Sequence, residues 1–363
     1  MDPRIEAHAE LLVDHCTDIQ QGDMVGVSAP PEAADLEVAI YEKVGERGGM
    51  PVGLGLPSRA MRAFASAVDV EDVETAEHAL AFVEEADVLI GVRASSNVSE
   101  MSDLDPQDMQ AFAKAQEPLQ TAQMECRWVG TQYPAPGNAQ KAEMSTAAYE
   151  EFVYDAVNKD WAEQRAFQAQ MVDLLEAGDE VHIVAGDDTD LRLSVADNPV
   201  KNDDAEVNLP GGEVFTAPVP DSVEGTVHFD KPVMSQGREI QGAYLEFENG
   251  EVVAHDADQH AEMLTALIET DEGASRVGEL GIGMNRAIDE FTYNMLFDEK
   301  MGDTIHLALG RAYEDTVADG NERNQSAVHK DMIVDMSEDS YIEIDGDVVQ
   351  RNGTFRFEDG FEM

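Results

Sequence analysis

The residues best suited to chemistry are a few carboxylates and imidazoles that lie among glycines and apolar side chains between residues 209 and 331. An ionised side chain in apolar surroundings is costly unless it is paired with an opposite charge or bound to a metal. These residues are therefore candidates for one shared site. The candidates are Glu213, Glu279, Glu299, His306, Tyr313, His329 and Asp331.

Glu213 and Glu279 each follow a glycine, which lets the backbone approach a ligand closely. Glu213 comes after Pro210-Gly-Gly and precedes Val-Phe, although a glutamate in such a position is also a common solvated turn residue. Glu279 is the stronger candidate, because the segment 277–283 carries almost no other polar side chain. We expect a cationic partner for it.

His306 lies in a run, 304–310, that alternates like a β-strand. His306, Ala308 and Gly310 share one face of this strand, and the small neighbours leave room for a ligand or ion beside the imidazole. A core histidine with satisfied hydrogen bonds is the alternative interpretation.

His329 and Asp331 are two residues apart, so both side chains point the same way in an extended segment. A histidine and an aspartate on one face suit a divalent metal with mixed nitrogen and oxygen ligands. The same spacing in His228 and Asp230 shows that the pair is a weak signal by itself.

Tyr313 and Glu299 are conditional candidates. A continuous strand would send Tyr313 to the face opposite His306, so it joins the site only if the chain bends after Gly310. Glu299 is a general base, a metal ligand or half of an ion pair with a neighbouring lysine.

Together these residues fit a two-metal hydrolytic site better than a structural zinc site, which would favour thiolates. Two metal ions would polarise a carbonyl and activate a water at neutral pH. The sequence contains no nucleophile elbow, no His-Glu-x-x-His helix and no phosphate-binding loop.

The charge of the chain is extreme, since 76 acidic against 23 basic residues give a net charge of −53. The acids are spread through every segment, which indicates a surface adapted to concentrated salt. Screening at about 1 M salt shortens the Debye length to about 3 Å and relieves the self-repulsion. A surface of this sign argues against nucleic acid as a partner.

The N-terminus lacks the features of a signal peptide, and no apolar run approaches the ~20 residues of a membrane span. We therefore expect a soluble cytoplasmic protein without a membrane partner. The length of 363 residues and the 43% hydrophobic content predict two domains with cores of their own.

The elements that must position the candidate residues change character near residue 178. Before it, strands and helices alternate, which predicts an α/β domain (1–178) with a mostly parallel sheet. After it, short strands dominate and predict a β-rich α+β domain (179–363) that carries the metal site. The first domain is expected to form a cavity wall or a dimer contact. The predicted strands are 24–28, 51–56, 87–93, 126–130, 180–185, 191–195, 225–230, 242–248, 251–254, 340–345 and 347–351. The predicted helices are 3–20, one between Pro31 and Gly48, 73–85, 106–116, 146–175, 259–270 and 285–296, with a loop at 133–138.

Several motifs resemble the aminopeptidase T family of metalloaminopeptidases over nearly the full chain. The most specific are Gly-Glu-Val-Phe-Thr-Ala-Pro (212–218), Gly-Glu-Leu-Gly (278–281), Asp-Glu-Lys (298–300) followed by Thr-Ile-His-Leu-Ala-Leu-Gly (304–310), and Ser-Ala-Val-His (326–329) with Asp331. The resemblance implies a cocatalytic pair of divalent ions (Zn, Co, Mn or Mg) and short peptide substrates. It also implies a homodimer.

The positions that match the metal site of the family are Glu213, Glu279, His306, Tyr313, His329 and Asp331, with Glu279 as the expected bridge between the ions. Glu299 and Tyr313 are the candidate catalytic residues. The chain departs from the family pattern at Arg286, Asp303 and Lys330. The predicted function is therefore a metal-dependent aminopeptidase adapted to high salt. The alternative is a noncatalytic protein that binds a small ligand and structural cations.

Overall fold

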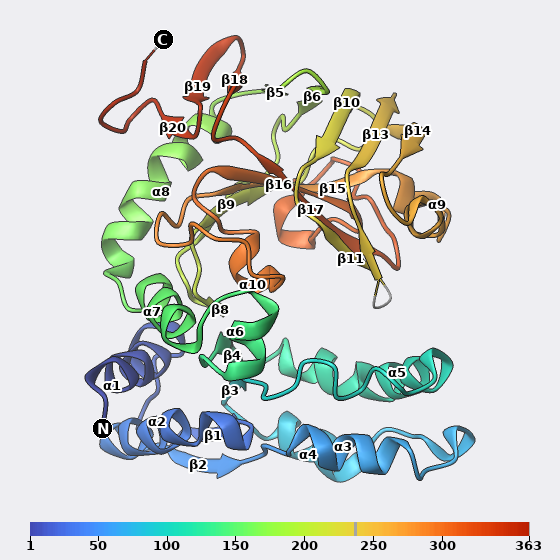
Figure 1. The fold of residues 1–363 in the computed structure, drawn as a ribbon. Coiled ribbons are helices and arrows are strands. Elements are labelled where there is room, and N and C mark those ends of the chain that lie inside the picture. Colours follow the sequence, from blue (N-terminus) through green and yellow to red (C-terminus); the bar gives the residue numbers. More distant parts are fainter. Residues whose placement is uncertain (236–237, 363) are drawn as a thin grey trace. The chain divides into compact units, whose positions relative to one another are not determined.

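The computed structural model describes residues 1–235 and 238–362, and the elements given below are those of the described residues (Figure 1). The contacts divide the chain into two compact units. The first comprises residues 1–159 and 205–211, and the second comprises residues 160–204 and 212–363.

The first unit is built on a parallel sheet with the strand order β2-β1-β3-β4-β8. The α/β fold with a parallel sheet that the alternating pattern predicts is thereby confirmed. Its strands are β1 (Met24–Ser28), β2 (Met50–Gly53), β3 (Val88–Arg93), β4 (Arg127–Gln132) and β8 (Asn208–Leu209). Its helices are α1 (Pro3–Glu10), continued by a π-helical segment (Leu11–Cys16), α2 (Ala34–Arg47), α3 (Ser58–Ala65), α4 (Glu77–Glu84), α5 (Pro106–Gln123), α6 (Pro136–Lys141) and α7 (Thr146–Val157).

The second unit is rich in antiparallel strands, as predicted. One of its sheets has the strand order β14-β13-β10-β6-β5-β18-β19-β20, a second has the order β17-β16-β15-β9-β7, and β11 pairs with β12. Its first strands are β5 (Glu180–Ala185), β6 (Thr189–Ser194), β7 (Lys201–Asp203), β9 (Glu213–Thr216), β10 (Glu224–Phe229), β11 (Val233–Ser235), β12 (Arg238–Ile240), β13 (Ala243–Glu248) and β14 (Glu251–Asp256). The others are β15 (Val277–Gly283), β16 (Thr304–Gly310), β17 (His329–Asp335), β18 (Ser340–Ile344), β19 (Asp347–Arg351) and β20 (Thr354–Phe355), and the helices are α8 (Trp161–Glu176), α9 (Ala261–Ile268) and α10 (Met295–Asp298).

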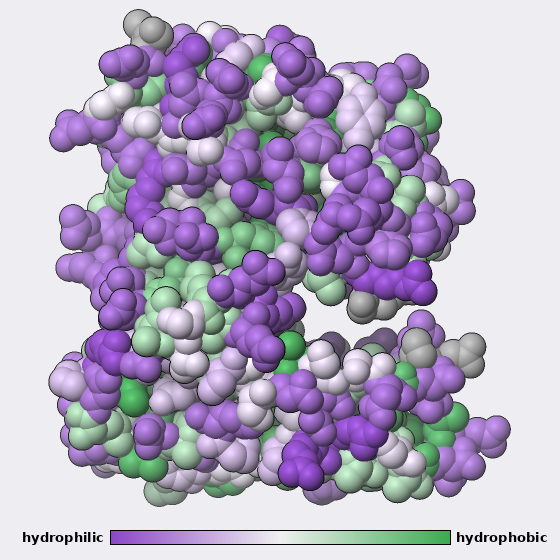
Figure 2. All heavy atoms as spheres, viewed as in Figure 1, coloured by the Kyte–Doolittle hydropathy of each residue, from purple (hydrophilic) through white to green (hydrophobic). Residues whose placement is uncertain are grey.

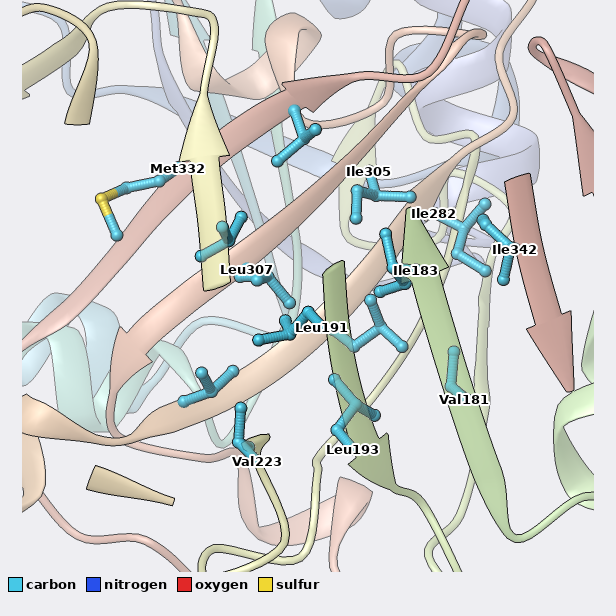
Figure 3. Close-up of a cluster of buried hydrophobic side chains, with 14 of the residues drawn as sticks. Val181, Ile183, Leu191, Leu193, Val223, Ile282, Ile305, Leu307, Met332 and Ile342 are labelled. Atoms are coloured by element: carbon cyan, nitrogen blue, oxygen red, sulfur yellow. The ribbon is translucent and has the colours of Figure 1, made fainter. Parts of the chain in front are cut away.

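The two large sheets of the second unit share one hydrophobic core. Val181, Ile183, Leu191 and Leu193 project from the β5–β6 hairpin toward side chains of β15, β16 and β17 (Figure 3). The alternate residues of β16, Ile305, Leu307 and Leu309, are all buried in this core, as the period-two pattern predicts. The other face of the same strands is thereby left to carry polar side chains.

The contacts of α8 place it in the second unit, whereas the predicted domain boundary lay after it, at 178. The amide of Gln168 on α8 donates to the Asn202 side chain and to the carbonyls of Asp203 and Glu213. Residues 205–211 group with the first unit, because β8 pairs with β4. Tertiary pairing of this kind has no local sequence signal.

Three predicted elements are wrong in part. The helix expected at 146–175 is two helices, because Asp160 caps a new one with bonds to the backbone of Ala162 and Glu163. The loop expected at 133–138 already contains the start of α6 at Pro136. The helix expected at 285–296 is absent from the described residues except for α10.

The segment 285–294 is held by bonds to other parts of the second unit instead of by helical hydrogen bonds. The Asn285 amide donates to the Lys300 carbonyl, and the Gly302 amide donates to the Ile288 carbonyl. The buried carboxylate of Asp298 accepts bonds from the Thr292 backbone and hydroxyl. Burial raises the pKa of Asp298 to about 7, and these bonds oppose the rise.

Candidate metal centre

One face of the sheet β17-β16-β15-β9-β7 brings the candidate residues together. Directly opposed residues of an antiparallel pair point to the same side. The register opposes Gly283 to Glu213, Ala308 to both Glu279 and Asp331, Gly281 to His306, and Gly310 to His329. Glu213, Glu279, His306, His329 and Asp331 therefore share the face that is turned away from the core.

The tightest group on this face consists of Glu279, His306 and Asp331. Each offers one ligand atom, and these atoms lie within 4.8 Å of one another, which makes this the only group of three such side chains among the described residues that could hold a metal ion. His306 Nε2 lies 3.1 Å from Glu279 Oε1 and 3.5 Å from Glu213 Oε2. The second oxygens, Glu213 Oε2 and Glu279 Oε2, are buried and have no hydrogen-bond partner within the described residues. Bound cations would satisfy these oxygens.

Both imidazoles are oriented by backbone carbonyls. His306 Nδ1 lies 3.1 Å from the Glu299 carbonyl and His329 Nδ1 lies 2.8 Å from the Arg311 carbonyl. Nδ1 must donate in both contacts, because a carbonyl can only accept. Nε2 of each ring then faces carboxylates, with His329 Nε2 3.4 Å from Asp331 Oδ1. A metal-binding histidine is usually held in this way.

Glycine makes the space that the His306 ring occupies. A Cβ atom added to Gly281 would lie 1.9 Å from His306 Cε1 and 2.2 Å from His306 Nε2. The strand β15 therefore needs glycine at this position. Sequence reasoning considered only the small residues on the strand of His306 itself, and missed the glycine on the neighbouring strand.

The charges of the site favour the ionised form of Asp331 and the protonated forms of His306 and His329. Burial would lower the pKa of His306, but the hydrogen bond with Glu279 and the charges of Glu213 and Glu279 raise it to about 10. Burial is likewise outweighed at His329, where the bond with Asp331 raises the pKa to about 9. Burial would raise the pKa of Asp331, yet His329 and His306 lower it to about 2. The proton on Nε2 of each imidazole therefore faces the carboxylates, in the place where a divalent cation would bind.

Lys300 is a part of the site that sequence reasoning did not include. Its side chain is completely buried, with Nζ 3.0 Å from Glu213 Oε1 and 3.7 Å from Asp203 Oδ2, and it forms an ion pair with Glu299. Burial alone would lower the pKa of Lys300, but the three acids raise it well above its usual value.

The signal for this arrangement was the Glu-Lys pair at 299–300, and the ion pair was one of the alternatives given for Glu299. Glu213 lies in the same cluster. Burial raises the pKa of Glu213 to about 8, although Lys300 opposes the rise.

Tyr313 lies beside the site because the chain bends after β16. The strand ends at Gly310, whose φ of 102° favours glycine, and the Tyr313 ring centroid lies 4.8 Å from that of His329. The centroid of the Phe215 ring lies 6.4 Å from that of Tyr313. Tyr313 remains 41% exposed, and its partial burial together with the charges of Glu279 and Asp331 raises its pKa.

The residues that depart from the family pattern lie outside this cluster. Arg286 forms ion pairs with Asp303 and with Glu358, and its guanidinium also donates to the Gly353 carbonyl at 2.7 Å. The ammonium of Lys330 donates to the Met234 carbonyl at 3.0 Å. The acid at 303 is therefore neutralised by the arginine at 286, so these two departures are coupled.

Sequence comparisons match this chain to a metalloprotease family and to several aminopeptidases. The model of the family described as thermophilic metalloprotease (M29) matches residues 1–355. Aminopeptidase AmpS of Bacillus subtilis (strain 168) is 26% identical over 98% of both chains. Aminopeptidase 2 of Geobacillus stearothermophilus is 35% identical over 172 residues, which cover 42% of this chain and only 40% of that relative.

The solved structures agree on the fold. Wild-type AmpT from Thermus thermophilus superimposes with a TM-score of 0.87 at 25% identity, covering 98% of this chain and 99% of that one. A 2,5-dihydroxypyridine dioxygenase from Pseudomonas putida KT2440 matches with a TM-score of 0.61 at 14% identity over 99% of both chains. The second likeness concerns the fold alone.

Proposed function

Since the chain belongs to the thermophilic metalloprotease (M29) family, we propose that it is a metal-dependent aminopeptidase that acts on short peptides with two divalent ions. Membership of this family makes the chain a metallopeptidase, that is, a hydrolase of peptide bonds. The removal of N-terminal residues is proposed from the relatives named aminopeptidase. The proposed ligands are Glu213, Glu279, His306, Tyr313, His329 and Asp331.

The observation that carries this proposal is the orientation of the two imidazoles. Each binds a backbone carbonyl through Nδ1 and turns Nε2 toward carboxylates, which is how a neutral imidazole is prepared to bind a metal. The buried Oε2 atoms of Glu213 and Glu279, without a hydrogen bond within the described residues, supply oxygen ligands beside them. Mixed nitrogen and oxygen ligands suit Zn, Co or Mn, and Mg is the remaining candidate.

The charge of the cluster supports two ions. The cluster contains five carboxyl groups (Asp203, Glu213, Glu279, Glu299 and Asp331) and one ammonium, so it carries four negative charges when all five carboxyl groups are ionised and both histidines are neutral ligands. Two divalent cations cancel this charge. One ion would leave a buried excess of negative charge, which is costly in a low dielectric.

Divalent ions bound here would polarise the scissile carbonyl and lower the pKa of a water molecule. Within the chain, we assign proton transfer to Glu299, whose side chain is 18% exposed against 7% for Glu213 and Glu279. Lys300 holds Glu299 in place through their ion pair. The raised pKa of Tyr313 keeps its phenol neutral, which suits donation of a hydrogen bond to the substrate.

The surface supports the proposed adaptation to concentrated salt. Hydrophilic residues cover most of the face drawn in Figure 2, and the sequence carries a net charge of −53. Among the described residues, no helix is both long and apolar enough to cross a membrane. From the resemblance to the aminopeptidase T family we further propose a homodimer, with the first unit as a cavity wall or a dimer contact. We also propose that the protein is cytoplasmic.

The test compares a short peptide that has a free N-terminus with the same peptide acetylated at its N-terminus, in molar KCl with Co²⁺ or Zn²⁺. We expect release of the first residue from the free peptide alone, loss of activity on chelation, and recovery when the ion returns. Glu279→Gln should lower kcat/KM by more than the about 10–100-fold that loss of an outer-shell partner costs.

The matched control is Glu248→Gln, which changes an exposed carboxylate on β13 and should leave kcat/KM unchanged. Equal cleavage of the acetylated peptide would contradict an aminopeptidase. Activity that survives both chelation and Glu279→Gln would contradict a metallopeptidase at this site.

A further inference from the structure

Lys300 is a completely buried cation in the second unit that the proposed reaction uses only indirectly. Its backbone is fixed on both sides, since the Lys300 amide donates to the Phe297 carbonyl at 2.9 Å and its carbonyl accepts from the Asn285 amide at 3.1 Å. A buried ammonium is costly unless it is paired and hydrogen-bonded. Its position is therefore specified by the groups around it.

Those groups are three carboxylates from three different segments. Asp203 ends β7, Glu213 begins β9, and Glu299 follows α10. The ammonium contacts Glu299, lies 3.0 Å from Glu213 Oε1, and lies 3.7 Å from Asp203 Oδ2. Carboxylate oxygens that converge on one point are suitable ligands for a divalent cation. In this chain an ammonium occupies that point.

The two oxygens of the Glu213 carboxylate face different partners because one of them binds the ammonium. Oε1 binds Lys300, whereas Oε2 lies 3.5 Å from His306 Nε2 and has no hydrogen bond within the described residues. One oxygen is thus used by the lysine and the other is left for the metal centre. Without the ammonium, the three carboxylates would face one another uncompensated.

We propose that Lys300 is an internal counter-ion that occupies the position of a third cation and so limits the centre to two divalent ions. The proposal rests on the metal-dependent function proposed above. It makes Lys300 a positioning residue, which acts through Glu213 and Glu299. Removal of the ammonium should open the three-carboxylate position to a metal ion from solution.

The test counts Mn²⁺ ions bound per chain, by equilibrium dialysis of the full-length protein in molar KCl followed by elemental analysis. Lys300→Met removes the charge, and Lys300→Arg keeps it. The double variant Asp203→Asn with Lys300→Met removes one charge of each sign. Lys231→Met is the matched control, because Lys231 forms a partly exposed ion pair with Asp335 at 3.0 Å in the same unit.

We expect wild type, Lys300→Arg, Lys231→Met and the double variant to bind two ions, and Lys300→Met to bind three. The melting temperature of Lys300→Met should also rise more steeply with Mn²⁺ concentration than that of wild type, because an additional ion binds only the folded state. A purely structural role for Lys300 would lower the melting temperature without changing the number of ions.

Two ions in folded Lys300→Met, or fewer than two, would overturn the proposal. If Lys300→Met does not fold, the double variant tests the proposal. Two ions bound to the double variant would support a role of Lys300 through its charge, and fewer than two would refute that role. The outcome is separable from the proposed function. Wild-type protein that binds two ions but releases no amino acid would refute the aminopeptidase and leave the ion count of the variants to test Lys300.

Discussion

His306 lies over a strand position that has no side chain. Its ring fills the space above Gly281, its Nδ1 is bound to the Glu299 carbonyl, and its Nε2 points to Glu279. The ring is therefore fixed from three directions. Because the geometry of a metal site tolerates little displacement, the glycine is as much a part of the site as the imidazole.

Gly281→Ala should displace the His306 ring, since the added methyl group would lie 1.9 Å from Cε1 and 2.2 Å from Nε2 of the ring in the present geometry. We expect metal affinity to fall about 10–100-fold, the usual cost of losing a group that orients a metal ligand. Calorimetric titration with Mn²⁺ measures the effect. Gly45→Ala is the control, because its Cβ would meet no atom within 4 Å, and unchanged affinity in Gly281→Ala would contradict the assigned role of His306.

The residues on the site face could be predicted because strand periodicity is local. Acids and imidazoles at alternate positions, among small and apolar neighbours, were sufficient to select His306, His329 and Asp331. Lys300 and Gly281 could not be found in this way, because their roles depend on which strands are neighbours. That order is set by long-range pairing.

At the scale of elements, the predictions succeeded where burial imposes a regular pattern and failed where a side chain or a tertiary bond interrupts it. The hairpin strands β5, β6, β18 and β19 were predicted within a few residues, because turns flank their alternating sequences. The helix expected at 285–296 was wrong in part, because bonds donated by Asn285 to the Lys300 carbonyl and by Thr292 to the Asp298 carboxylate replace helical ones. Helix propensity does not predict that tertiary hydrogen bonds will replace helical ones.

A neutral histidine on α1 links this helix to β4 in the first unit. His8 is completely buried, and its Nε2 donates to the Thr131 hydroxyl at 2.7 Å, which in turn donates to the Leu209 carbonyl at 2.7 Å. His8 Nδ1 has no hydrogen-bond partner within the described residues. Burial lowers the pKa of His8 to about 3 from its usual 6.5.

His8 should make stability fall with acidification. Below pH 6.5 the unfolded chain binds a proton at His8 that the folded chain excludes until about pH 3, so the free energy of unfolding falls as pH is lowered through this window. The expected slope is about 1.4 kcal/mol per pH unit well below pH 6.5. Urea unfolding in KCl measures it as the difference between wild type and His8→Gln, and equal slopes would refute the pKa assigned to His8.

At the scale of the whole molecule, acidity is the dominant property. The chain carries 76 acidic residues, which are spread along its whole length, and the face drawn in Figure 2 is largely hydrophilic. Composition alone predicted this surface. Composition cannot place the limits of the two units, because the strand β8 from the middle of the sequence completes the sheet of the first unit.

Potassium chloride should stabilise the fold. Screening at about 1 M shortens the range of carboxylate repulsion to about 3 Å. Each kcal/mol of relieved repulsion raises the melting temperature by about 2–4 °C in a domain of about 150–250 residues. Calorimetry from dilute buffer to molar KCl should therefore show a rising melting temperature, and an uncharged osmolyte at equal osmolality should produce a smaller rise. A melting temperature that is independent of KCl would contradict the proposed adaptation.

The central claim is that the polar face of the sheet β17-β16-β15-β9-β7 is a two-metal hydrolytic site. The most direct measurement is a titration of the metal-free protein with Co²⁺ in molar KCl, in which bound ions and release of the N-terminal residue are followed together. We predict that the metal-free protein releases no amino acid and that full activity is reached at two bound ions per chain. Glu279→Gln should regain neither the two bound ions nor the activity. Hydrolysis at full rate by the metal-free protein would contradict it.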